Sequence, residues 1–231
     1  MSVITISRQF GSGGDEIAEY ICNNTGFQLF DKSVLARAAF EAGLSDQEII
    51  DFSEDRYEIQ GFFDRLFGRS RTVKQVRTLM EYKEGVQVVE KMKLGEEQAL
   101  AFVKKAVLTA YNMGNQVIVG RGGQVILRSH PDVLHVRIEA ALEDRLERVR
   151  SYPDFEEDST SDSAEIQRLA QDKIDKSDAA SADYLKRFYN VDWSDPMLYH
   201  LILNTSKMTI EQAAGLIMET ARQLAIVPEP V

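Results

Sequence analysis

A glycine-rich turn between a β-branched run and an amphipathic segment limits the folds open to this chain of 231 residues. The run VITIS (Val3–Ser7) predicts a buried strand. A turn with three glycines (Gly11–Gly14) follows, and Asp15–Asn24 then places apolar residues at the spacing of a helix. The segment FQLF (Phe27–Phe30) predicts a second strand. Strand, glycine turn, helix and strand together form a βαβ unit, which is typical of a parallel sheet covered by helices.

Three later segments predict further strands of the same sheet. They are the apolar runs Asn115–Arg121, Val133–Ala140 and Leu201–Thr205. A last helix is predicted to begin at TIEQ (Thr209–Gln212), which has the form of a capping box, and to run to about Leu224. Strands that alternate with helices indicate the α/β class, here with five parallel strands and helices on both faces.

Two stretches between these elements are too long to be simple connections. The first, from residue 45 to about 112, is predicted to be mostly helical and opens with the capping-box sequence SDQE. The second spans residues 151–189. It begins with the acidic run Asp154–Glu165, which predicts an exposed connection, and continues as a helix that carries Lys173 and Lys176.

The composition argues against several classes of function. A formal net charge of −10 disfavours sequence-independent binding to nucleic acid, although a local basic pocket for a small anion is compatible with it. No apolar run approaches the roughly 18 residues that cross a bilayer. The first strand begins at Val3, which leaves no room for a signal peptide, and the single cysteine, Cys22, fits a reducing compartment. We therefore expect a cytoplasmic protein without a membrane partner.

The glycine turn has the outline of a phosphate-binding loop, which reads G-x-x-x-x-G-K-[ST]. In SRQFGSGGDEIA, Arg8 occupies the slot of the first glycine, Gly14 that of the lysine and Asp15 that of the hydroxyl residue. Backbone N–H groups at the start of a helix can still hold phosphates without any side chain. The other interpretation is a plain strand–helix turn that uses glycine for its backbone freedom. The candidate phosphate-binding residues are Arg8, Gly11, Ser12, Gly13, Gly14, Asp15 and Glu16.

Arg8 is the candidate for the positive charge that the lysine slot lacks. Its planar guanidinium suits phosphate oxygens, but a salt bridge with Asp15 or another carboxylate is the alternative. Asp15 could bind Mg²⁺ directly or through water. It could equally act only as an acidic residue in the first turn of a helix.

Arg121 stands between glycines at the end of the predicted strand 115–121. Ligands of open α/β sheets bind beyond the carboxyl ends of the strands, so Arg121 is a strong candidate for ligand contact. A structural ion pair is the alternative. Asp31 follows another strand, where it could orient a substrate hydroxyl or cap the next helix.

Five pieces of the chain, in order, carry a resemblance to one family. They read ITISRQFGSGGDEIA, FQLFDKSVLARAA, VIVGRGG, VLHVRIEAALEDRLERV and YNVDWSDPMLYHLILNTSKMTIEQAAGLI. From Val3 to about Ile217 the chain resembles the cytidylate kinase-like group within the nucleoside monophosphate kinases. In that group an arginine precedes the loop glycines and the lysine of the phosphate loop is absent.

The resemblance implies a single domain over residues 1–231 with the P-loop NTPase-type three-layer α/β/α fold. It implies that residues 45–112 form a helical acceptor-binding insertion and that residues 151–189 form a lid. It also implies phosphoryl transfer from ATP with Mg²⁺ to a nucleoside monophosphate, CMP-like, or to a similar small acceptor. Specificity for CMP itself does not follow from the family label.

The same resemblance implies roles for individual residues. Arg37 and Arg121 match arginines that bind the acceptor's phosphate, and Asp31 lies near the acceptor. Arg37 is on a predicted helix, so a solvent-exposed position without a ligand is the alternative for it. Gly122 stands where the cytidylate kinases carry an aspartate, so recognition of the acceptor's sugar or base is expected to differ. In the lid Ser181 occupies the slot of an arginine, which leaves Lys173 and Lys176 to neutralise the transferring group or merely to form a solvated helix face.

The sequence therefore predicts a small-molecule kinase in which Arg8, Arg121, Lys173 and Lys176 assist catalysis. Arg8 and the loop would hold the donor, while Asp31, Arg37 and Arg121 would hold the acceptor. A nucleotide-binding or sensing protein that kept the fold and lost catalysis is the alternative, and a dimeric scaffold is a third. A homodimer is compatible with each of them.

Overall fold

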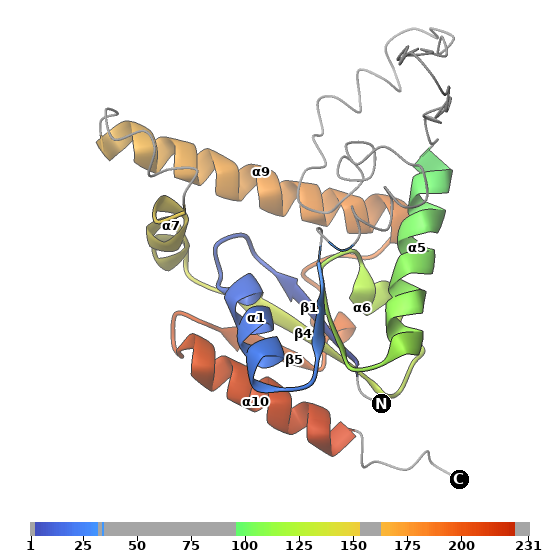
Figure 1. Cartoon of the computed structure of the whole chain (residues 1–231). Helices are drawn as coiled ribbons and strands as arrows, with labels where there is room; N and C mark the ends of the chain where they lie inside the picture. The colour runs from blue at the N-terminus through green and yellow to red at the C-terminus, as the bar shows by residue number, and fades with distance from the viewer. Residues whose placement is uncertain (1–2, 32–33, 35–95, 153–162, 225–231) are drawn as a thin grey trace, which may run out of the picture.

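The computed structural model describes residues 3–31, 34, 96–152 and 163–224, and it contains a parallel sheet between layers of helices (Figure 1). The strands are β1 (Val3–Arg8), β2 (Gln28–Phe30), β3 (Gln116–Val119), β4 (Val133–Glu139) and β5 (Leu201–Asn204). The helices are α1 (Gly14–Asn24), α5 (Glu96–Met113), α6 (Gly123–Ile126), α7 (Leu142–Arg150), α9 (Ser163–Tyr189) and α10 (Ile210–Leu224), with a 3-10 turn η1 (Pro196–Leu198) before β5.

The sheet has the strand order β2-β3-β1-β4-β5, and each neighbouring pair is parallel. Ile6 of the central strand β1 pairs with Val119 of β3 on one side and with Val136 of β4 on the other. All the strands therefore end at the same edge. The predicted three-layer α/β/α fold with a five-stranded parallel sheet is confirmed.

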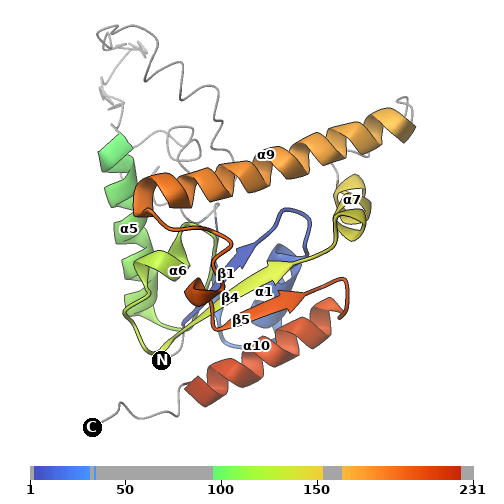
Figure 2. The same ribbon diagram turned by 180° about the vertical axis from the view of Figure 1, so that it is seen from behind.

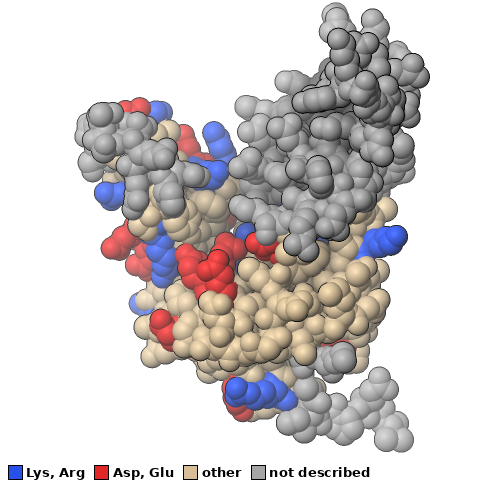
Figure 3. Space-filling model, viewed as in Figure 1, with Lys and Arg blue, Asp and Glu red and all other residues tan. Residues whose placement is uncertain are grey.

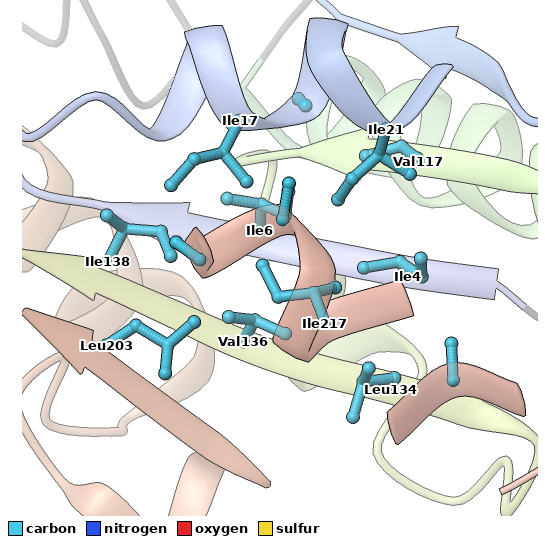
Figure 4. Close-up of a cluster of buried hydrophobic side chains, with 14 of the residues drawn as sticks. Ile4, Ile6, Ile17, Ile21, Val117, Leu134, Val136, Ile138, Leu203 and Ile217 are labelled. Carbon is cyan, nitrogen blue, oxygen red and sulfur yellow. The ribbon is translucent and has the colours of Figure 1, made fainter. Parts of the chain in front are cut away.

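One face of the sheet carries the main hydrophobic core (Figure 4). Ile4 and Ile6 of β1 point toward Ile17 of α1 and Ile217 of α10, and all four side chains are fully buried. Because successive strand residues point to opposite faces, this pattern assigns α1 and α10 to one side of the sheet. Burial of several such aliphatic side chains, each worth about 1.5–3 kcal/mol, fixes the start of α1 relative to β1.

The opposite face is more polar and lies beneath α5, α6 and the end of α9. Thr5 and Ser7 of β1 point to this side, where Thr5 Oγ1 lies 2.8 Å from His135 Nδ1 and Ser7 Oγ accepts from Trp193 Nε1 at 2.7 Å. The buried Arg137 of β4 lies 4.3 Å from the Trp193 ring and donates to the Trp193 carbonyl. These bonds satisfy polar groups that burial would otherwise penalise.

Helix α9 crosses the molecule above the sheet, as Figures 1 and 2 show from opposite sides. Its beginning lies against α7, and its end reaches α6. Residues 153–162 of the expected lid lie outside the described residues. The acidic connection predicted over 154–165 extends too far, because Ser163–Glu165 belong to α9, where Glu165 occupies the acid-favouring first turn.

Other boundaries depend on backbone conformation. Strand β3 ends at Val119 instead of Arg121 because Gly120, Arg121 and Gly122 all have positive φ, which no strand accommodates. The short helix α6 that follows was not predicted. The capping box of α10 is confirmed, because the Thr209 N–H donates to Gln212 Oε1 at 3.0 Å and the Gln212 N–H donates to Thr209 Oγ1 at 3.3 Å.

Of the predicted helical insertion, residues 45–95 lie outside the described residues. The part that is described, α5, is helical as predicted and ends at Met113. None of the helices in the described part of the chain combines the length and the apolar character needed to span a membrane.

Candidate functional site

The turn between β1 and α1 adopts a conformation that requires glycine at two positions. Gly11 has φ 77° and Gly13, the N-cap of α1, has φ 84°. A Cβ at Gly11 would lie 2.7 Å from Val149 Cγ2, and a Cβ at Gly13 would lie 2.7 Å from Ile210 Cδ1. The glycines therefore permit both the backbone conformation and its close packing against α7 and α10.

The start of α1 presents N–H groups without a side-chain cap. The first intrahelical bond runs from the Ile17 N–H to the Gly13 carbonyl at 3.0 Å, so the N–H groups of Gly14, Asp15 and Glu16 precede the helical ladder. Gly13 offers no side chain to accept from them. A helix start of this kind attracts anions through its N–H groups and its dipole.

Ser12, one of the predicted phosphate-binding residues, faces inward. Its side chain is 1% exposed, its hydroxyl donates to the Ile138 carbonyl at 3.2 Å, and its N–H donates to the Gln9 carbonyl at 3.1 Å. Both donors of Ser12 are therefore used to shape the loop. Gly11, Gly13 and Gly14 are buried as well, so the part of this stretch that reaches solvent is the first turn of α1, at Asp15 and Glu16.

Arg8 lies across Gly14, the residue in the lysine slot. A Cβ at Gly14 would lie 2.5 Å from Arg8 Cβ and 2.8 Å from Arg8 Cγ, so the stem of Arg8 fills the space of any side chain there. Arg8 Nε lies 3.3 Å from Asp15 Oδ1, and the two side chains are 12% and 60% exposed. The salt bridge considered for Arg8 is thus present, and it brings a cation to the start of α1.

A second arginine, which the sequence analysis did not identify, supports the loop from behind. Arg148 of α7 donates from Nη1 to the Gly11 carbonyl at 3.2 Å and from Nη2 to the Thr205 carbonyl at 3.0 Å. Thr205 Oγ1 in turn donates to the Ser12 carbonyl at 2.6 Å. These acceptors are backbone carbonyls from distant segments, which no motif identifies.

Tyr152 closes the side of the loop near Glu16. Burial, reinforced by the carboxylates of Glu16 and Asp15, raises the pKa of Tyr152 to about 12. The phenol therefore stays protonated and remains a hydrogen-bond donor toward Glu16. Its ring also meets the edge of the Phe10 ring, with centroids 6.0 Å apart.

Arg121 lies just beyond β3 and is almost completely buried. It is 2% exposed and has φ 62°, a left-handed conformation that a residue with a Cβ rarely adopts. Since Ile6 pairs with Val119, Arg121 and Arg8 each follow the paired residue by two positions at the same edge of the sheet. The fold thus places both predicted arginines at the carboxyl ends of neighbouring strands, Arg8 as the last residue of β1 and Arg121 just beyond β3.

Gly122, which replaces the family's aspartate, packs against the end of α9. A Cβ there would lie 3.1 Å from Tyr189 Cε2 and 3.5 Å from Tyr184 Cε1, and Gly122 has φ 66°. The aromatic rings of α9 thus leave little room for the family's aspartate. Both the crowding and the backbone conformation favour glycine.

Of the two remaining predicted acceptor residues, the structure describes Asp31 alone. Asp31 Oδ1 accepts from the Val34 N–H at 3.2 Å, which fits the interpretation of Asp31 as a helix cap. Arg37 lies outside the described residues.

In the lid region, the two candidate lysines differ in position. Lys173 Nζ lies 5.9 Å from the centre of the Phe10 ring, so this lysine reaches the loop. Lys176 is exposed on α9. Ser181, in the slot of the family's arginine, is 5% exposed and packs inward.

Charges of both signs surround the loop. Acidic side chains gather around the starts of α1 and α7 on the face seen in Figure 3, next to basic side chains. Within the described ranges, no group of three or more His, Cys, Asp or Glu side chains is arranged to hold a metal ion. Asp15, predicted as a Mg²⁺ ligand, thus lies outside any such cluster.

Comparison with known proteins agrees with the fold. Residues 3–207 match the sequence signature of the cytidylate kinase-like family. No curated protein matches this chain. Among solved structures, an uncharacterized protein from Eubacterium ventriosum ATCC 27560 is similar to this chain, with a TM-score of 0.58 and 17% sequence identity. The match covers 96% of this chain and 99% of that protein, and at this identity it shows a similarity of fold alone. A shikimate kinase from Bacteroides thetaiotaomicron has a TM-score of 0.47 and 11% identity, over 96% and 98% of the two chains.

Proposed function

Since this chain belongs to the cytidylate kinase-like family, we propose that it transfers the γ-phosphoryl group of ATP to a small acceptor, with nucleoside monophosphates as the first class to test. The observation that carries the proposal is the β1–α1 turn. Its left-handed Gly11 and Gly13 leave the N–H groups of Gly14, Asp15 and Glu16 at an uncapped helix start. This arrangement suits the phosphates of a nucleotide donor.

Arg8 supplies the positive charge that Gly14 cannot. Its stem fills the space of the lysine slot, and its Nε is held beside the first turn of α1 by Asp15. We therefore assign donor-phosphate binding to Arg8 and to the N–H groups of Gly14, Asp15 and Glu16, with Ser12 as a structural residue. Phosphoryl transfer depends mainly on positioning and charge neutralisation, which such groups provide.

Asp15 is the described residue that suits a Mg²⁺ contact in this loop. A single exposed carboxylate fits an ion that keeps most of its waters and is otherwise held by substrate phosphates. When bound, Mg²⁺ would neutralise charge on the donor phosphates. The Arg8–Asp15 pair would then have to adjust, because both partners have a role toward the same nucleotide.

Arg121 is assigned to the acceptor's phosphate, at the edge of the sheet that it shares with Arg8. Arg37 and Asp31 are assigned to the same acceptor by family resemblance. The crowding of Gly122 by Tyr189 and Tyr184 supports an acceptor whose sugar or base is recognised differently from that of CMP. Of the two lid lysines, Lys173 is favoured for charge neutralisation because it reaches Phe10 of the loop.

A nucleotide-binding or sensing protein without catalysis is the second candidate. The observation that favours it is the Arg8–Asp15 ion pair, because a carboxylate that pairs with the Arg8 guanidinium opposes tight binding of a triphosphate. The two candidates make different predictions for the same variants.

The test is phosphoryl transfer from Mg·ATP to a panel of nucleoside monophosphates by the purified full-length chain, with products followed directly. In a kinase, Arg8→Ala should lower kcat/KM by about a hundredfold or more, which is the range for loss of a charge-stabilising group. Arg222→Ala is the matched control, because Arg222 is an exposed arginine on α10 that pairs with Glu219. Binding of ATP that Arg8→Ala weakens, without transfer to any acceptor, would support the sensor. Absence of both binding and transfer would refute both candidates.

A further inference from the structure

Two charged side chains enclose the main chain of one loop residue, Phe10. Arg145 Nε of α7 donates to the Phe10 carbonyl at 2.8 Å, and the Phe10 N–H donates to Asp178 Oδ1 of α9 at 2.9 Å. The second carboxylate oxygen of Asp178 accepts from Arg145 Nη2, so the two side chains also bond to each other. We call this closed ring of three hydrogen bonds the Phe10 clamp.

The clamp is shielded from water. The side chain of Arg145 is 7% exposed and that of Asp178 is 22% exposed. Hydrogen bonds to charged groups are stronger than neutral ones, and low exposure strengthens them further. Phe10 directly precedes Gly11, the first left-handed residue of the loop. The clamp therefore fixes the backbone at the point where the loop begins to turn.

Helices α7 and α9 also hold the Phe10 side chain. The ring packs against a cluster that contains Val149 of α7 and Ile174 of α9, and it receives the Lys173 ammonium at 5.9 Å from its centre. Main chain and side chain of one loop residue are thus both tied to these two helices. A change in the clamp would alter the direction of the loop N–H groups and the placement of Lys173 together.

We propose that Asp178 and Arg145 are positioning residues for binding of the donor nucleotide: through Phe10 they hold the phosphate loop in register with α9. The inference rests on the proposed function, since it gives the loop's ligand as the phosphates of ATP. Neither residue contacts the ligand. Each acts through the Phe10 backbone.

The test compares three variants of the full chain. Asp178→Ala removes the acceptor of the Phe10 N–H, and Arg145→Lys keeps the charge but cannot donate to Phe10 and Asp178 through one planar fork. Asp175→Asn is the matched control, because Asp175 lies exposed on the same helix, where it accepts a hydrogen bond from Gln171 at 3.0 Å. For both clamp variants we expect the KM for ATP to rise about tenfold or more, the range for loss of a charged hydrogen bond, while the KM for the acceptor stays unchanged.

A merely structural role gives a different pattern. If both clamp variants unfold at a lower temperature yet keep the KM for ATP of the Asp175→Asn control, the proposal is overturned. Arg145→Lys keeps a cation beside the Asp178 carboxylate, so it tests the proposal even if the Asp178→Ala chain does not fold. The unfolding temperature of each variant without nucleotide supplies this comparison.

Failure of the proposed function is recognised separately. If the wild-type chain transfers no phosphoryl group, the proposed kinase activity is wrong. The role of the clamp is then tested by measuring how much ATP raises the unfolding temperature of each variant. A rise that both clamp variants lose and Asp175→Asn keeps would support the clamp. A rise that all three variants retain, or a wild type that ATP does not stabilise, would overturn it.

Discussion

Replacing Gly14 with alanine tests whether Arg8 has taken the place of the loop's usual lysine. An added Cβ at Gly14 would lie 2.5 Å from Arg8 Cβ and 2.8 Å from Arg8 Cγ. Both atoms lie close to the Arg8 backbone, so rotation of the guanidinium gives no relief. The Gly14→Ala chain must therefore move β1 and α1 apart or tolerate the overlap.

Two opposing effects decide the sign of the change in stability. Alanine in place of glycine inside a helix stabilises by roughly 0.5–1 kcal/mol. Forcing extra atoms into a filled space costs roughly 1–3 kcal/mol. We therefore expect Gly14→Ala to lower the free energy of unfolding by up to about 2.5 kcal/mol and the unfolding temperature by up to about 10 °C.

Thermal and urea unfolding, followed by the fluorescence of the single tryptophan Trp193, measure this change. Gly215→Ala on α10 is the control, because nothing lies within 4 Å of a Cβ there, and we expect it to stabilise the protein. In an Arg8→Gly background, which removes the Arg8 Cβ, the cost of Gly14→Ala should disappear. If Gly14→Ala stabilises as much as Gly215→Ala, or keeps its cost without the Arg8 side chain, the reasoning is wrong.

Three further predictions concern the packing around the site. Burial lowers the pKa of His135 to about 4, so the unfolded chain binds a proton at higher pH than the folded chain, and stability is lost as the pH falls below about 6.5. Urea unfolding should show a loss of about 2 kcal/mol in the free energy of unfolding between pH 7 and pH 5. His135→Gln should reduce this dependence of stability on pH. Thr209→Ala removes one half of the capping box of α10 and should cost about 1 kcal/mol in urea unfolding, and no loss would contradict its capping role. Ser7→Ala leaves the buried Trp193 N–H without its acceptor and should cost about 1–3 kcal/mol by the same assay, whereas an unchanged midpoint would indicate that water replaces the hydroxyl.

Local patterns in the sequence were sufficient for the sheet and most of its helices. The β-branched run at Val3–Ser7, the glycine turn and the capping box at Thr209 each depend on interactions within a few residues, and the structure has the corresponding elements. A predicted element boundary was wrong where the backbone conformation depended on contacts with a distant part of the chain. The strand predicted to reach Arg121 stops at Val119, because the backbone turns left-handed to pack beneath α9.

The candidate site divides in the same way. The sequence pointed to Arg8 as the relocated cation, and the structure adds why Gly14 must stay a glycine: the Arg8 stem covers it. The sequence left open whether Arg8 pairs with Asp15, and only the fold brings the two side chains to 3.3 Å.

By itself the sequence determined the family, the α/β class and the order of the strands along the chain, because these follow from short motifs and local periodicity. Only the tertiary structure decided what supports the phosphate loop. Phe10 and Asp178 lie 168 residues apart, and Arg148 lies 137 residues from Gly11. Because these bonds go to backbone carbonyl and N–H groups of the loop, they do not depend on which residues the loop contains. The loop sequence therefore does not reveal them. These contacts exist only once α7 and α9 pack against the loop that follows β1.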